Sequence, residues 1–184
     1  MARTSMENEI LELFFNYPTK QWHFKEVREK VPIADNKISK WLKILKKELF
    51  INKITPKGKM PYYISNYESP NFQNKKRLFA LKKLYDSGFL NHLSSLKNAK
   101  TVIIFGSMAR WDWHNQSDID LFILGDAKEL EQGKYERGLK REIQLFTCKD
   151  ESELKKFNKD LIKSIIQGDI IKGNLDFLNV GVNA

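Results

Sequence analysis

Residues 101–124, TVIIFGSMARWDWHNQSDIDLFIL, constrain this chain more than any other stretch. An apolar run that is typical of a buried strand ends at Gly106 and Ser107. After a short polar segment, Asp118 and Asp120 open a second apolar run. Side chains alternate along a strand, so the two carboxylates share one face. The segment therefore predicts two buried strands, with an acidic pair where the second one begins.

A carboxylate pair beside a Gly-Ser turn is suited to a metal ion and a phosphate. Mg2+ prefers oxygen ligands and commonly takes one or two carboxylates while substrate phosphates complete its shell, so Asp118 and Asp120 are the predicted metal ligands. Gly106 permits a sharp turn, and Ser107 would begin a helix whose free N–H groups attract phosphate. Either dipeptide alone is typical of an ordinary turn. Both together, between two apolar strands, favour a nucleotide site.

The order Gly106-Ser107, Arg110, Ser117-Asp118-Ile119-Asp120 resembles the signature of the DNA polymerase beta nucleotidyltransferase superfamily, in particular its minimal nucleotidyltransferases. The resemblance covers residues 100–175 and implies transfer of a nucleoside monophosphate from an NTP to an acceptor. It further implies Mg2+ or Mn2+ as cofactor and ATP as the expected NTP. Asp118 and Asp120 would act as catalytic metal ligands. The residues expected to contact the nucleotide are Gly106, Ser107, Arg110 and Ser117.

The sequence departs from this signature in two places. Arg110 is followed by Trp111-Asp112-Trp113-His114, whose aromatic rings either stack on a base or pack the loop against its own domain. At the position where active members carry a third carboxylate, this chain has Gln144. Glu142, two residues earlier and on the same strand face, is the candidate third acid, as metal ligand or general base. The alternative for Glu142 is a solvated charge at a strand entrance.

Length and composition limit the class of protein. A chain of 184 residues that is 41% hydrophobic can form one medium domain or two small ones. No apolar stretch approaches the roughly 18–20 residues that a membrane-spanning helix needs. The single cysteine, Cys148, excludes an intramolecular disulfide and a Cys/His zinc cluster, and it is expected either to pack or to be exposed without a role. These features predict a cytoplasmic protein without a membrane partner.

Charge is divided unevenly along the chain. Residues 1–100 hold 20 Lys and Arg against 9 Asp and Glu, whereas residues 101–184 hold 12 against 14. The net charge of +9 therefore belongs to the first half. Such asymmetry is typical of a nucleic-acid-binding module joined to a domain of another kind.

The first 65 residues resemble a winged helix-turn-helix domain. Apolar residues at helical spacing predict three helices, the third with an apolar stripe of Ile38, Trp41, Leu42, Leu45 and Leu49. A hairpin with a basic tip follows at residues 50–64. In this fold the third helix reads the major groove and the wing contacts the backbone. The residues predicted to contact DNA are Asn36, Lys37, Lys40, Lys43, Lys57 and Lys59. A merely solvated lysine-rich helix is the alternative.

The predicted architecture is α+β. It has a winged helix-turn-helix domain at 1–67, a helical linker at 68–98, a nucleotidyltransferase α/β domain with a small mixed sheet at 99–178, and a tail at 179–184. The linker is predicted to form two amphipathic helices with a break at Ser87-Gly88. These helices serve either as a plain connection or as a homodimer interface. Lys75-Lys76-Arg77 is expected to be a solvated helix start. Further helices are expected at 128–139 and 151–167, with strands at 142–147 and 170–171.

Two functions from different classes follow. In the first, the protein is a nucleotidyltransferase whose acceptor is unidentified; relatives include antitoxins that modify or mask a partner toxin. In the second, it is a DNA-binding regulator whose transferase domain senses a nucleotide without turnover. Gly106-Ser107 and Asp118-Ile119-Asp120 favour the enzyme, whereas Gln144 favours the regulator.

Overall fold

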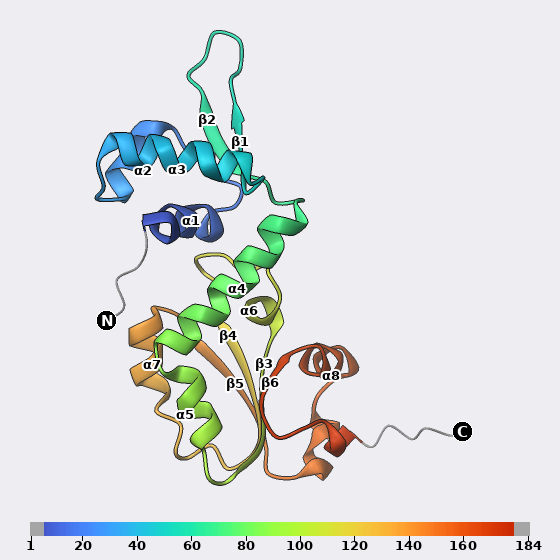
Figure 1. Cartoon of the computed structure of the whole chain (residues 1–184). Coiled ribbons are helices and arrows are strands. Elements are labelled where there is room, and N and C mark those ends of the chain that lie inside the picture. The colour runs from blue at the N-terminus through green and yellow to red at the C-terminus, as the bar shows by residue number, and fades with distance from the viewer. Residues whose placement is uncertain (1–5, 179–184) are drawn as a thin grey trace. The chain divides into compact units, whose positions relative to one another are not determined.

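The computed structural model describes residues 6–178, which form two compact units (Figure 1). Unit 1 runs to Leu78 and also includes Trp113–Asn115. Unit 2 consists of Phe79–Asp112 and the residues from Gln116 onward. The boundary falls inside one helix, α4 (Pro70–Asp86), so the expected linker is divided between the two units. The expected tail at 179–184 lies outside the described residues.

Unit 1 has the element order expected of a winged helix-turn-helix. Its elements are α1 (Met6–Asn16), α2 (Phe24–Lys30), α3 (Asp35–Lys47), β1 (Ile51–Ile54) and β2 (Tyr62–Ser65). The two strands pair antiparallel, with Ile54 opposite Tyr62, and form the hairpin labelled in Figure 1. Eight apolar side chains from the three helices are fully or almost fully buried and form the core: Ile10, Leu11, Phe14, Phe15, Val27, Ile38, Leu42 and Leu45.

The end of α3 corrects one expectation. Leu49 was expected in the apolar stripe, but the helix ends at Lys47 and Leu49 is 56% exposed with a φ of 63°. The N–H of Phe50 donates to the carbonyl of Leu45 (2.9 Å), and that of Leu49 donates to Lys46 (3.2 Å). This is a Schellman ending, in which the left-handed residue points outward and the next apolar residue folds back. Phe50 therefore takes the buried place predicted for Leu49.

Unit 2 is built on a small mixed sheet, as predicted. Its strands are β3 (Ala99–Phe105), β4 (Ile119–Gly125), β5 (Ile143–Cys148) and β6 (Asp169–Lys172), in the spatial order β5-β4-β3-β6. β3 pairs antiparallel with β4 and with β6, whereas β4 and β5 are parallel. The two strands of the signature are thus the two central strands.

Helices cover both faces of this sheet. α5 (Phe89–Ser95) and α7 (Gln132–Leu139) lie on one side, and α8 (Lys159–Ile166) lies on the other (Figure 1). The side of α8 holds a cluster of seven buried residues: Ile103, Phe105, Phe122, Leu124, Cys148, Ile165 and Phe177. Asp120, Phe122 and Leu124 are spaced two residues apart along β4, so their side chains lie on the same face of the sheet. Cys148 is fully buried in the cluster, so of the two predicted alternatives it packs and is not exposed.

Three helical expectations can now be compared with the structure. The break at Ser87-Gly88 is confirmed, with Gly88 at a φ of 77° between α4 and α5. The helix expected at 128–139 begins only at Gln132, because Asp126 accepts a bond from the Lys128 N–H (2.9 Å) and forms a turn there.

The helix expected at 151–167 is two pieces, η1 (Glu151–Lys156) and α8. The Asn158 side chain caps α8 by accepting from the Leu161 N–H (2.8 Å), so a new helix starts after it. A last turn, η2 (Asp176–Leu178), follows β6. Within residues 6–178, every helix is too short or too polar to cross a membrane.

Candidate active site

The turn after β3 brings Gly106 directly against Asp120. Phe105 and Asp120 are partners in the antiparallel ladder, and Gly106 begins the single-turn helix α6 (Gly106–Ala109) with a φ of 71°. A Cβ atom at Gly106 would lie 2.0 Å from Asp120 Oδ2. Two features therefore require glycine at position 106: the left-handed backbone conformation and the closeness of the Asp120 carboxylate.

Asp118 immediately precedes β4, and Asp120 is the second residue of that strand. Asp118 is exposed and Asp120 is partly buried. Burial raises the pKa of Asp120, the negative charge of Asp118 raises it further, and Arg110 opposes the rise. A carboxylate that is both desolvated and next to another carboxylate is stabilised by a nearby cation. The pair is therefore electrostatically suited to bind one.

Arg110, Ser107 and Ser117 are the other predicted nucleotide contacts, and the positive charge of Arg110 acts on Asp120. Nε and Nη2 of Arg110 donate to the two carboxylate oxygens of Asp112 at 3.1 and 3.0 Å, and this bond raises the pKa of Arg110. Ser107 is partly buried in α6. The carbonyl oxygen of Ser117 accepts from the Arg141 guanidinium at 2.5 Å, which fixes the backbone one residue before Asp118.

The neighbouring strand places an amide, not an acid, beside Asp120. Gln144 of β5 is the register partner of Asp120. Glu142 was expected inside the strand, but β5 begins at Ile143. Glu142 is exposed, and its carbonyl accepts from the Ile119 N–H (2.9 Å). Asp118, Glu142 and Gln144 nevertheless line one pocket of about 550 Å3, together with Gln132, Glu136, Ile143 and Leu145.

Glu136 is an acid of this pocket that the sequence analysis missed. Its carboxylate accepts from Gln132 Nε2 at 2.9 Å and from the Ile143 N–H at 3.0 Å. These two bonds lower the pKa of Glu136 and tie α7 to the start of β5. The spacing of Gln132 and Glu136, four residues apart on a predicted helix, was the available signal.

The donor set fits a divalent cation with substrate oxygens in its shell. Asp118 and Asp120 supply carboxylate oxygens, the ligand type that Mg2+ prefers. Among residues 6–178 no three His, Cys, Asp or Glu side chains are grouped closely enough to hold a metal by themselves. Phosphate oxygens of a substrate would complete the shell around the two carboxylates.

The basic face of unit 1 consists of Asn36, Lys37, Lys40, Lys43, Lys57 and Lys59. All six are exposed: the first four lie on α3, and the last two in the turn between β1 and β2. The opposite side of α3 carries the buried Ile38, Leu42 and Leu45. The structure thus brings each predicted nucleic-acid contact to the surface of the helix or the hairpin tip.

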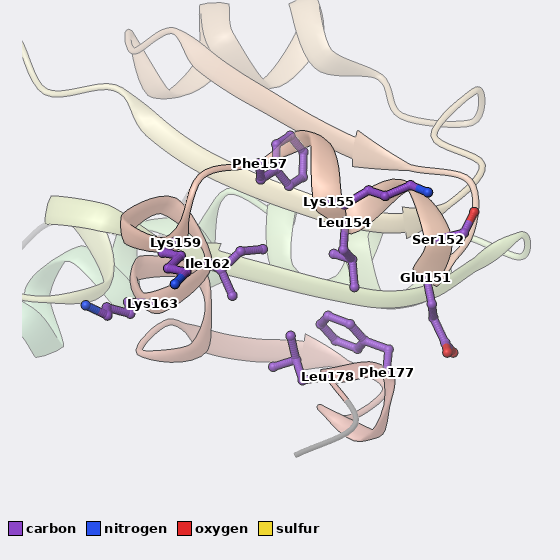
Figure 2. A pocket seen from close by; sticks show the side chains of 10 residues that line it. All are labelled: Glu151, Ser152, Leu154, Lys155, Phe157, Lys159, Ile162, Lys163, Phe177 and Leu178. Carbon is purple, nitrogen blue, oxygen red and sulfur yellow. The ribbon is translucent and has the colours of Figure 1, made fainter. Parts of the chain in front are cut away.

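Another pocket lies between η1, α8 and η2 (Figure 2). It has a volume of about 710 Å3, and Leu154, Ile162, Phe177 and Leu178 project into it. None of the predicted site residues is among its lining residues. It is therefore separate from the signature.

Residues 90–175 match the family described as "Polymerase beta, Nucleotidyltransferase". This segment is a polymerase beta-type nucleotidyltransferase domain. It spans just under half of the chain and contains every residue of the signature. The resemblance drawn from the sequence is thereby confirmed for the second half of the protein.

Two solved structures are similar at low identity, and no curated protein matches the sequence. Apo, heme-free PefR is 18% identical, with 46% of this chain and 74% of that chain covered and a TM-score of 0.36. A mutant of the toxin-antitoxin MntA-HpeT is also 18% identical, with 54% and 75% covered and a TM-score of 0.34. At these TM-scores neither likeness identifies a function.

Proposed function

We propose that the nucleotidyltransferase domain transfers a nucleoside monophosphate from an NTP, ATP in the first instance, to an acceptor. The observation that carries this proposal is the close approach of Gly106 to Asp120, with Asp118 immediately before the first residue of β4. Because Gly106 has no side chain, the carboxylate of Asp120 lies directly against the turn whose backbone N–H groups would receive a phosphate. The match of residues 90–175 supports the same reaction class.

Each residue of the site has a proposed task. Asp118 and Asp120 hold the cation, which would be Mg2+ or Mn2+ and would neutralise phosphate charge and polarise the transferred phosphoryl group. Gly106 and Ser107 receive the phosphates at the start of α6. Arg110, held by Asp112, presents a fixed positive charge close to Asp120. Ser117 sets the backbone that leads into Asp118.

The acceptor is proposed to enter the pocket lined by Asp118, Glu142 and Gln144. Glu142 is exposed there and is the candidate general base for an acceptor hydroxyl. Gln144 donates and accepts hydrogen bonds but carries no charge, so it orients the acceptor or a phosphate. We propose a protein acceptor, such as a toxin for which this chain is the antitoxin.

We further propose that the basic face binds DNA. Its six residues are exposed on the two elements that contact DNA in winged helices. A homodimer is a compatible proposal, because α4 leaves three apolar side chains exposed at i, i+3 and i+7: Leu78, Leu81 and Tyr85. These residues offer a stripe that a second copy can cover.

One observation favours a second candidate function. Gln144 stands opposite Asp120, where a third carboxylate would complete the acidic set. A domain with this change can bind nucleotide yet transfer it slowly or not at all. In that case the protein is a DNA-binding regulator that responds to nucleotide.

A labelling experiment separates the two functions. The protein is incubated with each α-labelled NTP, Mg2+ or Mn2+, and lysate as acceptor source, beside the double variant Asp118→Asn, Asp120→Asn. The enzyme is supported if the wild type transfers label at least ~100-fold faster than the double variant. Nucleotide binding that alters DNA affinity without NTP consumption supports the regulator instead.

A further inference from the structure

Lys76 is the one charged side chain that is buried within residues 6–178. It was expected in a solvated helix start, but its exposed fraction is 0%. Its ammonium lies 4.7 Å from the ring centre of Trp113, 5.8 Å from that of Phe72 and 5.9 Å from that of Tyr67. Nζ also donates a hydrogen bond to the carbonyl oxygen of Trp113. Burial of a charged group costs free energy unless hydrogen bonds or aromatic rings compensate it. The carbonyl of Trp113 and the three rings provide this compensation for Lys76.

The segment Trp113–Asn115 belongs to the same compact unit as Lys76. The N–H of Asn115 donates to the carbonyl of Asn16 at 3.0 Å. The ring of Trp113 meets that of Phe15 edge-on, with centroids 6.0 Å apart. Lys76 thus completes a set of contacts that fix this short segment by its backbone and its one buried side chain.

This segment is the middle of the loop that carries the nucleotide signature. Residues 110–118 connect α6 to β4 without a helix or strand of their own. Arg110 begins the loop and Asp118 ends it. Fixing the middle of a loop leaves two shorter free spans, and shorter spans have fewer conformations to lose when a ligand binds. Arg110 and Asp118 lie on these two shorter spans, one on each side of Trp113–Asn115.

We propose that Lys76 is a positioning residue of the nucleotide site. It holds the carbonyl of Trp113 and, through the chain, the geometry of Arg110 and Asp118. The proposal rests on the proposed function, because it concerns binding at that same signature. A buried lysine that serves only the stability of unit 1 would leave nucleotide affinity unchanged.

The test replaces Lys76 by methionine, which keeps the length of the side chain and suits an aromatic environment but cannot donate to Trp113. Lys75→Met is the matched control, since Lys75 loses the same charge one residue away and its partner is Glu7 (3.2 Å). Leu42→Ala is the stability control, since Leu42 lies in the core of the same unit and its removal leaves the contacts of Lys76 with Trp113 in place. Mg-ATP affinity and amide hydrogen exchange at residues 113–118 are measured in all four proteins.

We expect Lys76→Met to weaken Mg-ATP binding about 10-fold and to speed exchange at 113–118. Lys75→Met should stay within about 2-fold of the wild type, as a partly exposed surface change does. Unchanged exchange in Lys76→Met overturns the proposal. Faster exchange with unchanged affinity also overturns it, as does an equal loss of affinity in Leu42→Ala. A wild type that binds no Mg-ATP overturns the proposed function instead, and the exchange rates still decide whether Lys76 holds the loop.

Discussion

The two units present their charged groups in opposite ways. In unit 2, Asp120 is partly buried, lies against Gly106 and faces Gln144 in strand register. In unit 1, the basic face is fully on the surface, and the fold of α3 depends on the apolar residues behind it. The difference teaches that geometry restricts the role of the carboxylates closely, whereas the lysines are restricted only by charge and position. A substitution in the acidic site of unit 2 should therefore have an effect that depends on its exact position. Each lysine removed from the basic face of unit 1 should instead weaken DNA binding by a similar amount.

The largest effect is expected from supplying the third carboxylate. Gln144→Asp places an acid opposite Asp120 and should raise the rate of nucleotidyl transfer by about 100-fold, because a carboxylate there can bind the cation or take a proton. Pyrophosphate release is the measurement, and Gln144→Asn is the neutral control. Equal rates in all three proteins would show that the amide at 144 does not limit the reaction.

Replacing the glycine of the turn should cost stability. Gly106→Ala puts a Cβ 2.0 Å from Asp120 Oδ2 in a left-handed backbone, so the free energy of unfolding should fall by about 2 kcal/mol. Urea unfolding measures it. Gly138→Ala is the matched control, because Gly138 lies in α7 with open space around it and should gain about 0.5–1 kcal/mol. Equal effects at both positions would contradict the close approach at Gly106.

Substitutions in the basic face test whether each lysine contributes separately to DNA binding. Lys40→Ala with Lys57→Ala removes one charge from α3 and one from the hairpin tip, and should weaken DNA binding by about 10-fold at low salt. The dependence on salt should become shallower, which a fluorescence-anisotropy titration at several salt concentrations measures. Lys155→Ala with Lys159→Ala is the control, with the same charge loss on exposed residues of unit 2. Equal weakening by both pairs would mean that net charge alone binds the DNA.

The smallest effect concerns the pH dependence of the acidic pair. Burial and Asp118 raise the pKa of Asp120, so the folded state takes up the proton more readily than the unfolded chain. The resulting stability is complete below the unfolded pKa and is lost as the pH rises through the folded pKa. At neutral pH Asp120→Asn should therefore raise the melting temperature by about 2 °C, with the gain vanishing in acid. A lower melting temperature for this variant at neutral pH would contradict the unfavourable burial of the charge.

Much of unit 2 could be predicted because its signals are local. The apolar runs predict β3 and β4, and the period of two predicts one face for Asp118 and Asp120. The family resemblance adds that Gln144 lies beside them, as the register of β4 and β5 shows for Asp120. Helix boundaries were predicted less well. Asn158 caps a new helix inside a continuous amphipathic pattern, and an apolar period does not reveal such a cap.

The parts that could not be predicted depend on contacts distant in sequence. The sequence around Lys76 predicts a surface lysine. Its burial is explained only by the contact with Trp113, which lies 37 residues later in the chain. For Trp113 the sequence predicts either stacking on a base or packing of the loop against its own domain, whereas the structure places it in unit 1, against Phe15. Glu136 likewise lies at the pocket because its carboxylate accepts a hydrogen bond from the Ile143 N–H, and no sequence motif predicts this contact.

The central claim is that the signature in unit 2 binds a nucleotide together with a divalent cation. Calorimetric titration of Mg-ATP into the wild type and into the double variant Asp118→Asn, Asp120→Asn tests it most directly, with circular dichroism to confirm that both are folded. We predict saturable binding by the wild type that depends on Mg2+ and is at least ~10-fold weaker in the double variant. Equal Mg-ATP affinity in the two folded proteins, or no binding by either, would contradict the account.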